Sequence, residues 1–174
     1  MLIINIYHKT LMKKFCLVLL ILFVISSKSL FSQSYDFELP DLDGNNVKLS
    51  ALLEKGPVLI SFWALWCVPC KEEMRIVNGI YAKYKDSGFV YIAMNQDSPK
   101  SSAKVKSYIE SKEYKFFVLL DSDGHIFDTF GGQNLPYSVL INRKGNVVKT
   151  YTGYMEGDES KIEQDIVNVM KEPK

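Results

Sequence analysis

The stretch that decides the fold reads Ser61-Phe62-Trp63-Ala64-Leu65-Trp66-Cys67-Val68-Pro69-Cys70. It continues an apolar run that begins at Pro57, and such a short, nearly continuous run is typical of a strand buried on both faces. After Pro69 the apolar residues follow helical spacing, at Met74, Val77, Ile80, Tyr81 and Tyr84. The two cysteines are therefore predicted to lie where a buried strand leads into a helix.

This position gives the two cysteines different chemistry. At a helix N-terminus, unpaired backbone N–H groups and the positive end of the helix dipole favour the thiolate of Cys67, which makes it the attacking group. Cys70 lies three residues further along the same helix face, close enough to close a disulfide with Cys67. Pro69 gives up an N–H that has no partner in the first helical turn. The pattern predicts a redox-active dithiol in which Cys70 resolves a mixed disulfide formed at Cys67.

Zinc sites and structural disulfides also use the C-x-x-C pattern. A tetrahedral zinc site needs about four ligands, and beyond residue 32 the chain has two cysteines and one histidine, His125, so a closed site would require carboxylates. A disulfide across so short a loop removes little entropy from the unfolded chain. We therefore favour redox chemistry and expect no metal and no cofactor.

The overall charge hides an uneven distribution. The chain has 174 residues with 21 Lys and Arg against 20 Asp and Glu, which gives a net charge of +1 and no reason to expect nucleic acid as a partner. The first 32 residues hold four lysines and no acidic residue, so the remainder carries 17 basic and 20 acidic residues. A basic leader thus precedes a mildly acidic part of a length suited to one domain.

The leader has the layout of a secretory signal. Lys13 and Lys14 precede an apolar run of 11 residues from Phe15 to Ile25, and small residues follow. This run is shorter than the roughly 18 to 20 residues that span a bilayer. We expect residues 1–32 to be a signal peptide and residues 33–174 to be a domain in the periplasm or at the outer face of the cytoplasmic membrane. An uncleaved signal anchor is the alternative.

Cleavage and lipidation both depend on residues near the apolar run. Ser27 and Ser29 supply the small residues that a signal peptidase reads, and Ser32 is an alternative end. A lipoprotein cysteine follows small residues at the end of the run, whereas Cys16 lies at its beginning. We interpret Cys16 as an inert apolar residue of the signal.

The remaining patterns alternate between strands and helices. An N-terminal hairpin is predicted over 37–44 and 47–49, and the chain closes with a helix whose apolar positions are Ile162, Ile166, Val169 and Met170. The elements predicted between them are a strand at 89–94, a helix at 102–111, a strand at 116–120, a short helix at 126–130, and a hairpin at 137–142 and 147–151. This order predicts an α/β fold, a mixed sheet with helices on both faces.

The motifs together resemble the thioredoxin superfamily. The stretch 61–70 is similar to its active-site strand and turn, and Leu135-Pro136-Tyr137-Ser138-Val139-Leu140-Ile141 is similar to its second landmark, in which a cis-proline opens a strand facing the cysteines. The signal, the N-terminal hairpin, a central insertion over 98–120 and the phrase at 119–124 resemble exported TlpA/ResA-like thiol-disulfide oxidoreductases. The resemblance covers about Tyr35 to the last helix and implies a thioredoxin-like fold.

The resemblance also implies residues that bind the substrate. A cis Pro136 would leave the backbone of Leu135 free to pair with a substrate peptide. Trp66 would pack beside the sulfurs and form part of the docking surface, with simple core packing as the alternative. We interpret Trp63 as a core residue.

Glu73 is the candidate for moving protons. It lies on the Cys70 side of the helix, where the resembled group carries a glutamate thought to manage protons for the buried thiol. A partly buried carboxyl would have a raised pKa and could accept the proton of Cys70. The alternative for Glu73 is a solvated carboxylate paired with Lys71 or Arg75. We interpret Glu72 as solvated.

At two positions the chain differs from the patterns of related families, and it has one further histidine to interpret. Cytoplasmic thioredoxins have a buried aspartate six residues before the first cysteine, where this chain has Ser61, so the proton role shifts toward Glu73. Peroxiredoxins usually have a threonine three residues before the attacking cysteine, where this chain has Ala64. His125 follows a turn and is predicted to be exposed.

These residues predict an exported thiol-disulfide oxidoreductase that works as a reductant. Its expected partners are disulfide-containing exported proteins, with apocytochrome c as one candidate, and a membrane thiol electron donor that restores the dithiol. Two alternatives remain open: a copper-binding protein on the same fold that uses the cysteines with His125, and a peroxiredoxin-like peroxidase.

Overall fold

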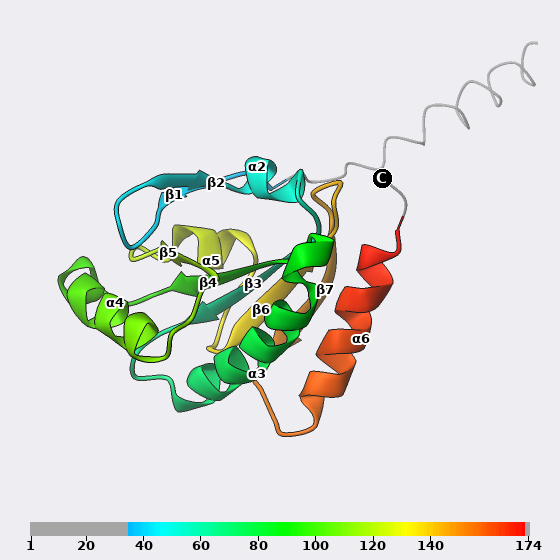
Figure 1. Cartoon of the computed structure of the whole chain (residues 1–174). Coiled ribbons are helices and arrows are strands. Elements are labelled where there is room, and N and C mark those ends of the chain that lie inside the picture. Colours follow the sequence, from blue (N-terminus) through cyan, green and yellow to red (C-terminus); the bar gives the residue numbers. More distant parts are fainter. Residues whose placement is uncertain (1–34, 173–174) are drawn as a thin grey trace, which may run out of the picture. The chain divides into compact units, whose positions relative to one another are not determined.

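A five-stranded mixed sheet forms the centre of the domain (Figure 1). The computed structural model describes residues 35–172, so the predicted leader and Cys16 lie outside the described residues. The strand order is β5-β4-β3-β6-β7; β3, β4 and β5 run parallel, while β6 and β7 are antiparallel to their neighbours. The strands are β3 (Val58–Trp63), β4 (Val90–Asn95), β5 (Phe117–Leu120), β6 (Tyr137–Ile141) and β7 (Val147–Thr152).

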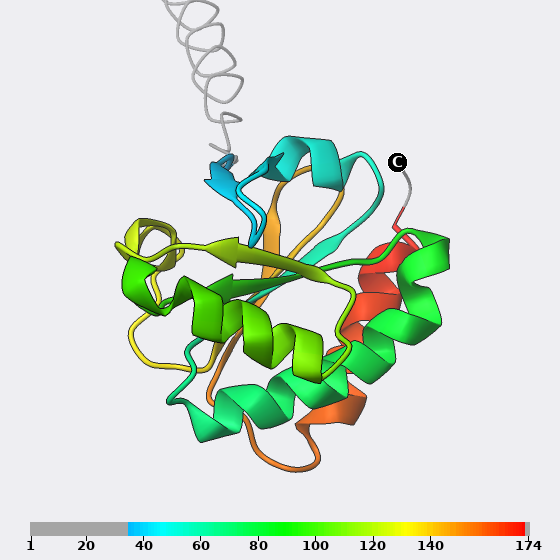
Figure 2. The ribbon, with the colours of Figure 1, turned by 60° about the vertical axis from the view of Figure 1, so that its left-hand side comes forward.

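Two apolar cores lie on the two faces of this sheet. The first lies between the sheet and three helices, α3 (Val68–Tyr84), α4 (Ser102–Ser111) and α6 (Asp158–Met170), as Figures 1 and 2 show. The second lies under the elements on the other face. These are the hairpin of β1 (Glu38–Pro40) and β2 (Asn46–Lys48), α2 (Leu49–Leu53) and α5 (His125–Thr129). Two short 3₁₀ helices, η1 (Lys85–Ser87) and η2 (Pro99–Ser101), lie in the connections before and after β4.

The predicted mixed sheet, the helices on both faces and the N-terminal hairpin are confirmed. The prediction was wrong at Leu49, which begins the unpredicted helix α2 and does not continue the return strand of the hairpin; several other predicted bounds differ by one residue. Leu49 and Leu52 are both buried against the sheet, and a helical turn brings residues three apart onto one side, whereas a strand would turn one of them away. The predicted insertion contains η2, α4 and β5.

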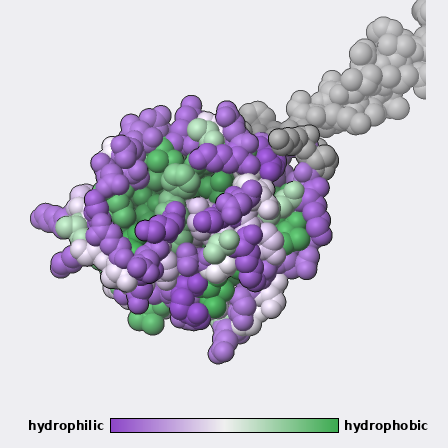
Figure 3. Space-filling view, viewed as in Figure 1, coloured by the Kyte–Doolittle hydropathy of each residue, from purple (hydrophilic) through white to green (hydrophobic). Residues whose placement is uncertain are grey.

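Strand β3 carries the chain from the sheet to the cysteines. All six of its residues are buried; Leu59 and Trp63 pack in the core under α3, and the alternate residues Val58, Ile60 and Phe62 pack in the other. The surface seen in Figure 3 is hydrophilic over most of the domain, with hydrophobic residues in smaller patches. Within residues 35–172, none of the helices has the length and hydrophobicity needed to cross a bilayer.

Candidate active site

The two cysteines lie at the N-terminus of α3, as predicted, and they form a disulfide. Cys67 is the N-cap residue, and its sulfur accepts a hydrogen bond from the Cys70 backbone N–H at 3.3 Å. Cys67 is 4% exposed and Cys70 is 1% exposed, so Cys67 is the more accessible of the two. In the reduced protein, an N–H directed at the sulfur and the helix N-terminus would both favour a thiolate at Cys67.

The turn before Cys67 is held by groups at the end of the neighbouring strand β4. Cys67 N–H donates to the Ala64 carbonyl at 3.0 Å, and Leu65 N–H donates to Asp97 Oδ2 at 2.8 Å. Asn95 Nδ2 donates to the same Asp97 oxygen at 2.8 Å. Sequence reasoning missed Asn95 and Asp97. The available signal was their position at the end of a buried parallel strand, because the carboxyl ends of parallel strands meet at one edge of the sheet.

Glu73 is buried, with 2% of its surface exposed, and does not pair with Lys71 or Arg75. Arg75 instead contacts Glu72 through Nε at 3.1 Å, and both side chains are exposed. The solvated alternative is therefore wrong for Glu73, while the interpretation of Glu72 as solvated is confirmed. The i,i+3 spacing places Glu73 on the same side of α3 as Cys70, toward the sheet.

Two serines on adjacent strands bind the Glu73 carboxylate. Ser138 Oγ donates to Glu73 Oε1 at 2.6 Å and lies 2.7 Å from Ser61 Oγ, which is itself 3.5 Å from the same carboxylate oxygen. Ser61 and Ser138 are direct partners in the register of β3 and β6. Ser61 thus contacts the Glu73 carboxyl group although its own side chain is not an acid. Sequence reasoning missed Ser138; the signal was a single serine in each of two strands made otherwise of apolar and aromatic residues.

Burial raises the pKa of Glu73 from its ordinary value of 4.5 to about 7. The hydrogen bonds from Ser138 and Ser61 oppose this rise in pKa, and the negative charge of Asp158 adds to it. Tyr91, which is fully buried, also has a raised pKa because of burial and the charge of Glu73. A carboxyl with this pKa can gain or lose a proton near neutral pH.

The predicted substrate-binding residues Leu135 and Pro136 lie near the C-terminal end of β3, the end that leads to Cys67. Because β6 is antiparallel to β3 and Tyr137 pairs with Phe62, Pro136 and Leu135 lie at the end of the sheet from which the chain continues to Cys67. The Leu135–Pro136 bond is cis, as predicted; Leu135 is half-buried and Pro136 is buried. Both residues therefore lie at the same end of the sheet as Cys67.

The two tryptophans have opposite environments. Trp66 is 72% exposed, which contradicts the core-packing alternative, and Trp63 is a buried core residue, as predicted. His125 is exposed, as expected. Within the described part of the chain, no three His, Cys, Asp or Glu side chains come together in a way that could hold a metal ion.

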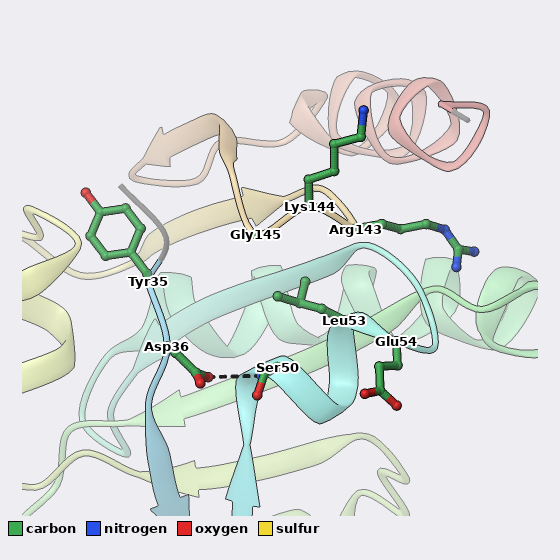
Figure 4. Close-up of a pocket in the computed structure, with 8 residues that line it drawn as sticks. All are labelled: Tyr35, Asp36, Ser50, Leu53, Glu54, Arg143, Lys144 and Gly145. Atoms are coloured by element: carbon green, nitrogen blue, oxygen red, sulfur yellow. Dashed lines mark hydrogen bonds between the residues drawn. The ribbon is translucent and has the colours of Figure 1, made fainter. Parts of the chain in front are cut away.

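A hollow of about 270 Å³ lies at the other end of the sheet and is separate from the cysteines (Figure 4). It is lined by Tyr35, by residues of α2 and by the turn that follows β6. Because β6 pairs with β3 in the antiparallel sense, this turn lies next to the start of β3. Asp36 accepts a hydrogen bond there from the Ser50 backbone N–H at 3.0 Å. No predicted site residue lines this hollow.

Comparisons with known proteins identify a family and several relatives of the chain. The profile of the Redoxin family matches residues 20–166. Thiol-disulfide oxidoreductase ResA of Bacillus subtilis is 36% identical over 151 residues, which cover 85% of this chain and 81% of that protein. ResA of Bacillus thuringiensis subsp. konkukian is 36% identical over 118 residues, which cover 68% of this chain and 66% of that protein's length.

Solved structures show the same fold. The structure of a protein described as a putative thiol:disulfide interchange protein DsbE from Chlorobium tepidum superposes with a TM-score of 0.72 at 32% sequence identity. The match covers 79% of this chain and 94% of that one. The predicted thioredoxin-like α/β fold, with its mixed sheet flanked by helices, is therefore confirmed.

Proposed function

The chain belongs to the Redoxin family and is a relative of the ResA thiol-disulfide oxidoreductases, and from this premise we propose that it reduces disulfides in partner proteins through the Cys67/Cys70 couple. The observation that carries the proposal is the position of the couple. Cys67 receives a backbone N–H at the start of α3, while the carboxyl of Glu73, six residues further along the chain, has a pKa of about 7. A nucleophile and a proton acceptor thus lie within the first two turns of one helix.

The reaction begins at Cys67. Its thiolate attacks one sulfur of the partner's disulfide, so a mixed disulfide forms and the partner's second sulfur leaves as a thiolate. Cys70 then loses its proton and attacks the Cys67 sulfur, which breaks the mixed disulfide and releases the partner's first sulfur. The partner gains two electrons, and the Cys67–Cys70 disulfide seen in the structure is the product.

Glu73 acts in the second step. Cys70 is 1% exposed, so bulk water has little access to its proton, and burial keeps a thiol of this kind protonated. Glu73 accepts that proton in its carboxylate form, which Ser138 and Ser61 stabilise. Trp66 and the backbone of Leu135 hold the partner polypeptide.

We place the domain, residues 33–174, outside the cytoplasm behind a signal at residues 1–32. The 11-residue apolar run after Lys13 and Lys14 supports export. The substrates are then disulfide-containing exported proteins, among which apocytochrome c is a candidate. A thiol donor in the membrane returns Cys67 and Cys70 to the reduced state, because an oxidising compartment supplies little free thiol.

The redox potential tests whether the protein is a reductant. We expect titration of the couple against glutathione or dithiothreitol buffers, followed by Trp fluorescence, to give a potential near or below about −250 mV. A value near that of strong oxidants, about −120 mV, would contradict the proposed direction of electron transfer.

A further inference from the structure

A groove of about 630 Å³ runs between α3 and α4 and begins next to the cysteines. Val68, the residue after Cys67, lines its near end and is 74% exposed. Lys112 and Tyr114 at the end of α4 line the other wall. Figures 1 and 2 both show α4 beside α3 on this face of the sheet. A polypeptide whose disulfide reaches Cys67 can therefore lay its neighbouring residues along this groove.

The groove is basic and aromatic, although the domain is acidic. Tyr108 and Tyr114 supply two half-buried rings, and Lys71 Nζ lies 5.2 Å from the centre of the Tyr108 ring. Among the ion pairs found within residues 35–172, none involves Lys71 or Lys112. By contrast, residues 33–174 carry 17 basic and 20 acidic residues. The groove is thus a local concentration of positive charge.

The opposite side of α3 has the reverse charge. A second hollow of about 500 Å³ is lined by Pro69 and Tyr154 together with the acidic residues Glu156 and Glu159. The ion pair between Arg75 and Glu72 lines both hollows and forms the ridge between them. Because its two charges cancel, the ridge does not obscure the contrast between the basic and the acidic side. A bound polypeptide therefore meets opposite charges on the two sides of the cysteine helix.

We propose that the groove between α3 and α4 binds the partner residues adjacent to the disulfide and selects a segment that carries carboxylates beside an apolar or aromatic side chain. The carboxylates face Lys71 and Lys112, while the apolar side chain packs on Val68 and the two tyrosine rings. This inference rests on the proposed function and adds the chemistry of the partner. The insertion that contains α4 is the part of the fold that supplies the far wall.

The test compares two synthetic peptides, each closed by a disulfide and each with a Phe next to one cysteine. They differ only in the two residues beyond the Phe, which are Glu in one peptide and Lys in the other. We expect the reduced protein to react about three to ten times faster with the Glu peptide, since exposed ion pairs contribute modestly. The ratio should fall as salt is added. The overall negative charge of the domain favours binding of the Lys peptide. A faster reaction with the Glu peptide would therefore indicate that the peptide binds in the basic groove.

Lys112→Glu is the informative variant, because Lys112 lines the groove and is exposed, so its replacement leaves the apolar core intact. We expect it to lower the ratio of Glu-peptide to Lys-peptide rates at least about twofold, with Lys112→Gln in between. Lys104→Glu makes the same charge change on α4 at an exposed residue outside the groove, and it should leave the ratio unchanged. Using a ratio cancels general effects on thiol reactivity.

Two results would overturn the groove assignment. One is a wild-type protein that reduces the Lys peptide as fast as the Glu peptide. The other is a ratio that is the same in Lys112→Glu as in the wild type. Hydroxyethyl disulfide, a small neutral substrate, distinguishes failure of the groove assignment from failure of the proposed function. If the reduced protein reacts with it but does not discriminate between the peptides, only the groove assignment is wrong. If it does not react, the proposed function fails and the groove assignment fails with it.

Discussion

Replacing Glu73 by Gln should change how the stability of the oxidised protein depends on pH. Burial raises the pKa of Glu73 from 4.5 to about 7, and each pKa unit corresponds to about 1.4 kcal/mol. The carboxyl therefore binds its proton more tightly in the folded chain than in the unfolded chain. The associated stability is fully present below pH 4.5 and is lost as the pH rises to about 7, which amounts to about 3 kcal/mol.

A glutamine side chain cannot ionise, so the Glu73→Gln variant avoids this loss. Relative to the wild type, we expect the variant to gain about 3 kcal/mol in free energy of unfolding between pH 4.5 and pH 8. The measurement is a series of urea titrations of both proteins across that range, with the Cys67–Cys70 disulfide intact so that neither cysteine titrates. Taking the difference between the proteins removes the contributions of all other ionisable groups.

The same series contains the refuting result. If the difference in free energy of unfolding stays constant within about 0.5 kcal/mol from pH 4.5 to pH 8, Glu73 has the same pKa in the folded and unfolded chains. The buried carboxyl would then lack the elevated pKa on which its proposed role depends. Glu72→Gln is the matched control, since that carboxylate is exposed and its pKa is lowered, chiefly by its hydrogen bond with Arg75.

Two further pairs of substitutions test neighbouring parts of the site. Ser138→Ala removes the 2.6 Å hydrogen bond to the Glu73 carboxylate and should raise the pKa of Glu73 by roughly one unit, which carboxyl ¹³C NMR measures. Ser61→Ala should raise this pKa less, because Ser61 Oγ lies 3.5 Å from the same carboxylate oxygen. Equal shifts would contradict the assigned geometry. Trp66→Ala should change stability by less than about 0.5 kcal/mol while slowing reduction of a protein disulfide, whereas Trp63→Ala should cost about 3 to 5 kcal/mol. Unchanged turnover in Trp66→Ala would remove that residue from the docking surface.

Most of the fold could be predicted because local signals agreed with one another. The apolar runs that became β3 and β4 are buried on both faces, and the helix predicted over 102–111 is α4. The place of Leu49 could not be predicted, because three residues of alternation do not distinguish a strand from the first turn of a helix. Its position in α2 is decided by contacts with the sheet, which no local pattern records.

The site was predictable where it depends on spacing along one helix and unpredictable where it depends on strand register. Cys70 follows Cys67 by three residues and Glu73 follows Cys70 by three, so helical geometry predicts that each of these two pairs lies close together. Ser138 reaches Glu73 only because β6 pairs with β3 in the register that sets Ser138 opposite Ser61. A slip of one residue would turn Ser138 to the other face of the sheet, and the sequence alone does not fix that register.

The assignment of Cys67 as nucleophile and Cys70 as resolving thiol is tested most directly by trapping. The Cys70→Ser protein is reduced, mixed with a disulfide-containing protein substrate and separated on a non-reducing gel, with Cys67→Ser treated in parallel. Because only Cys70 can break the mixed disulfide from within, we expect Cys70→Ser to remain covalently joined to the substrate through Cys67 and Cys67→Ser to form no such species. Equal trapping by both variants, or trapping by Cys67→Ser alone, would contradict the account.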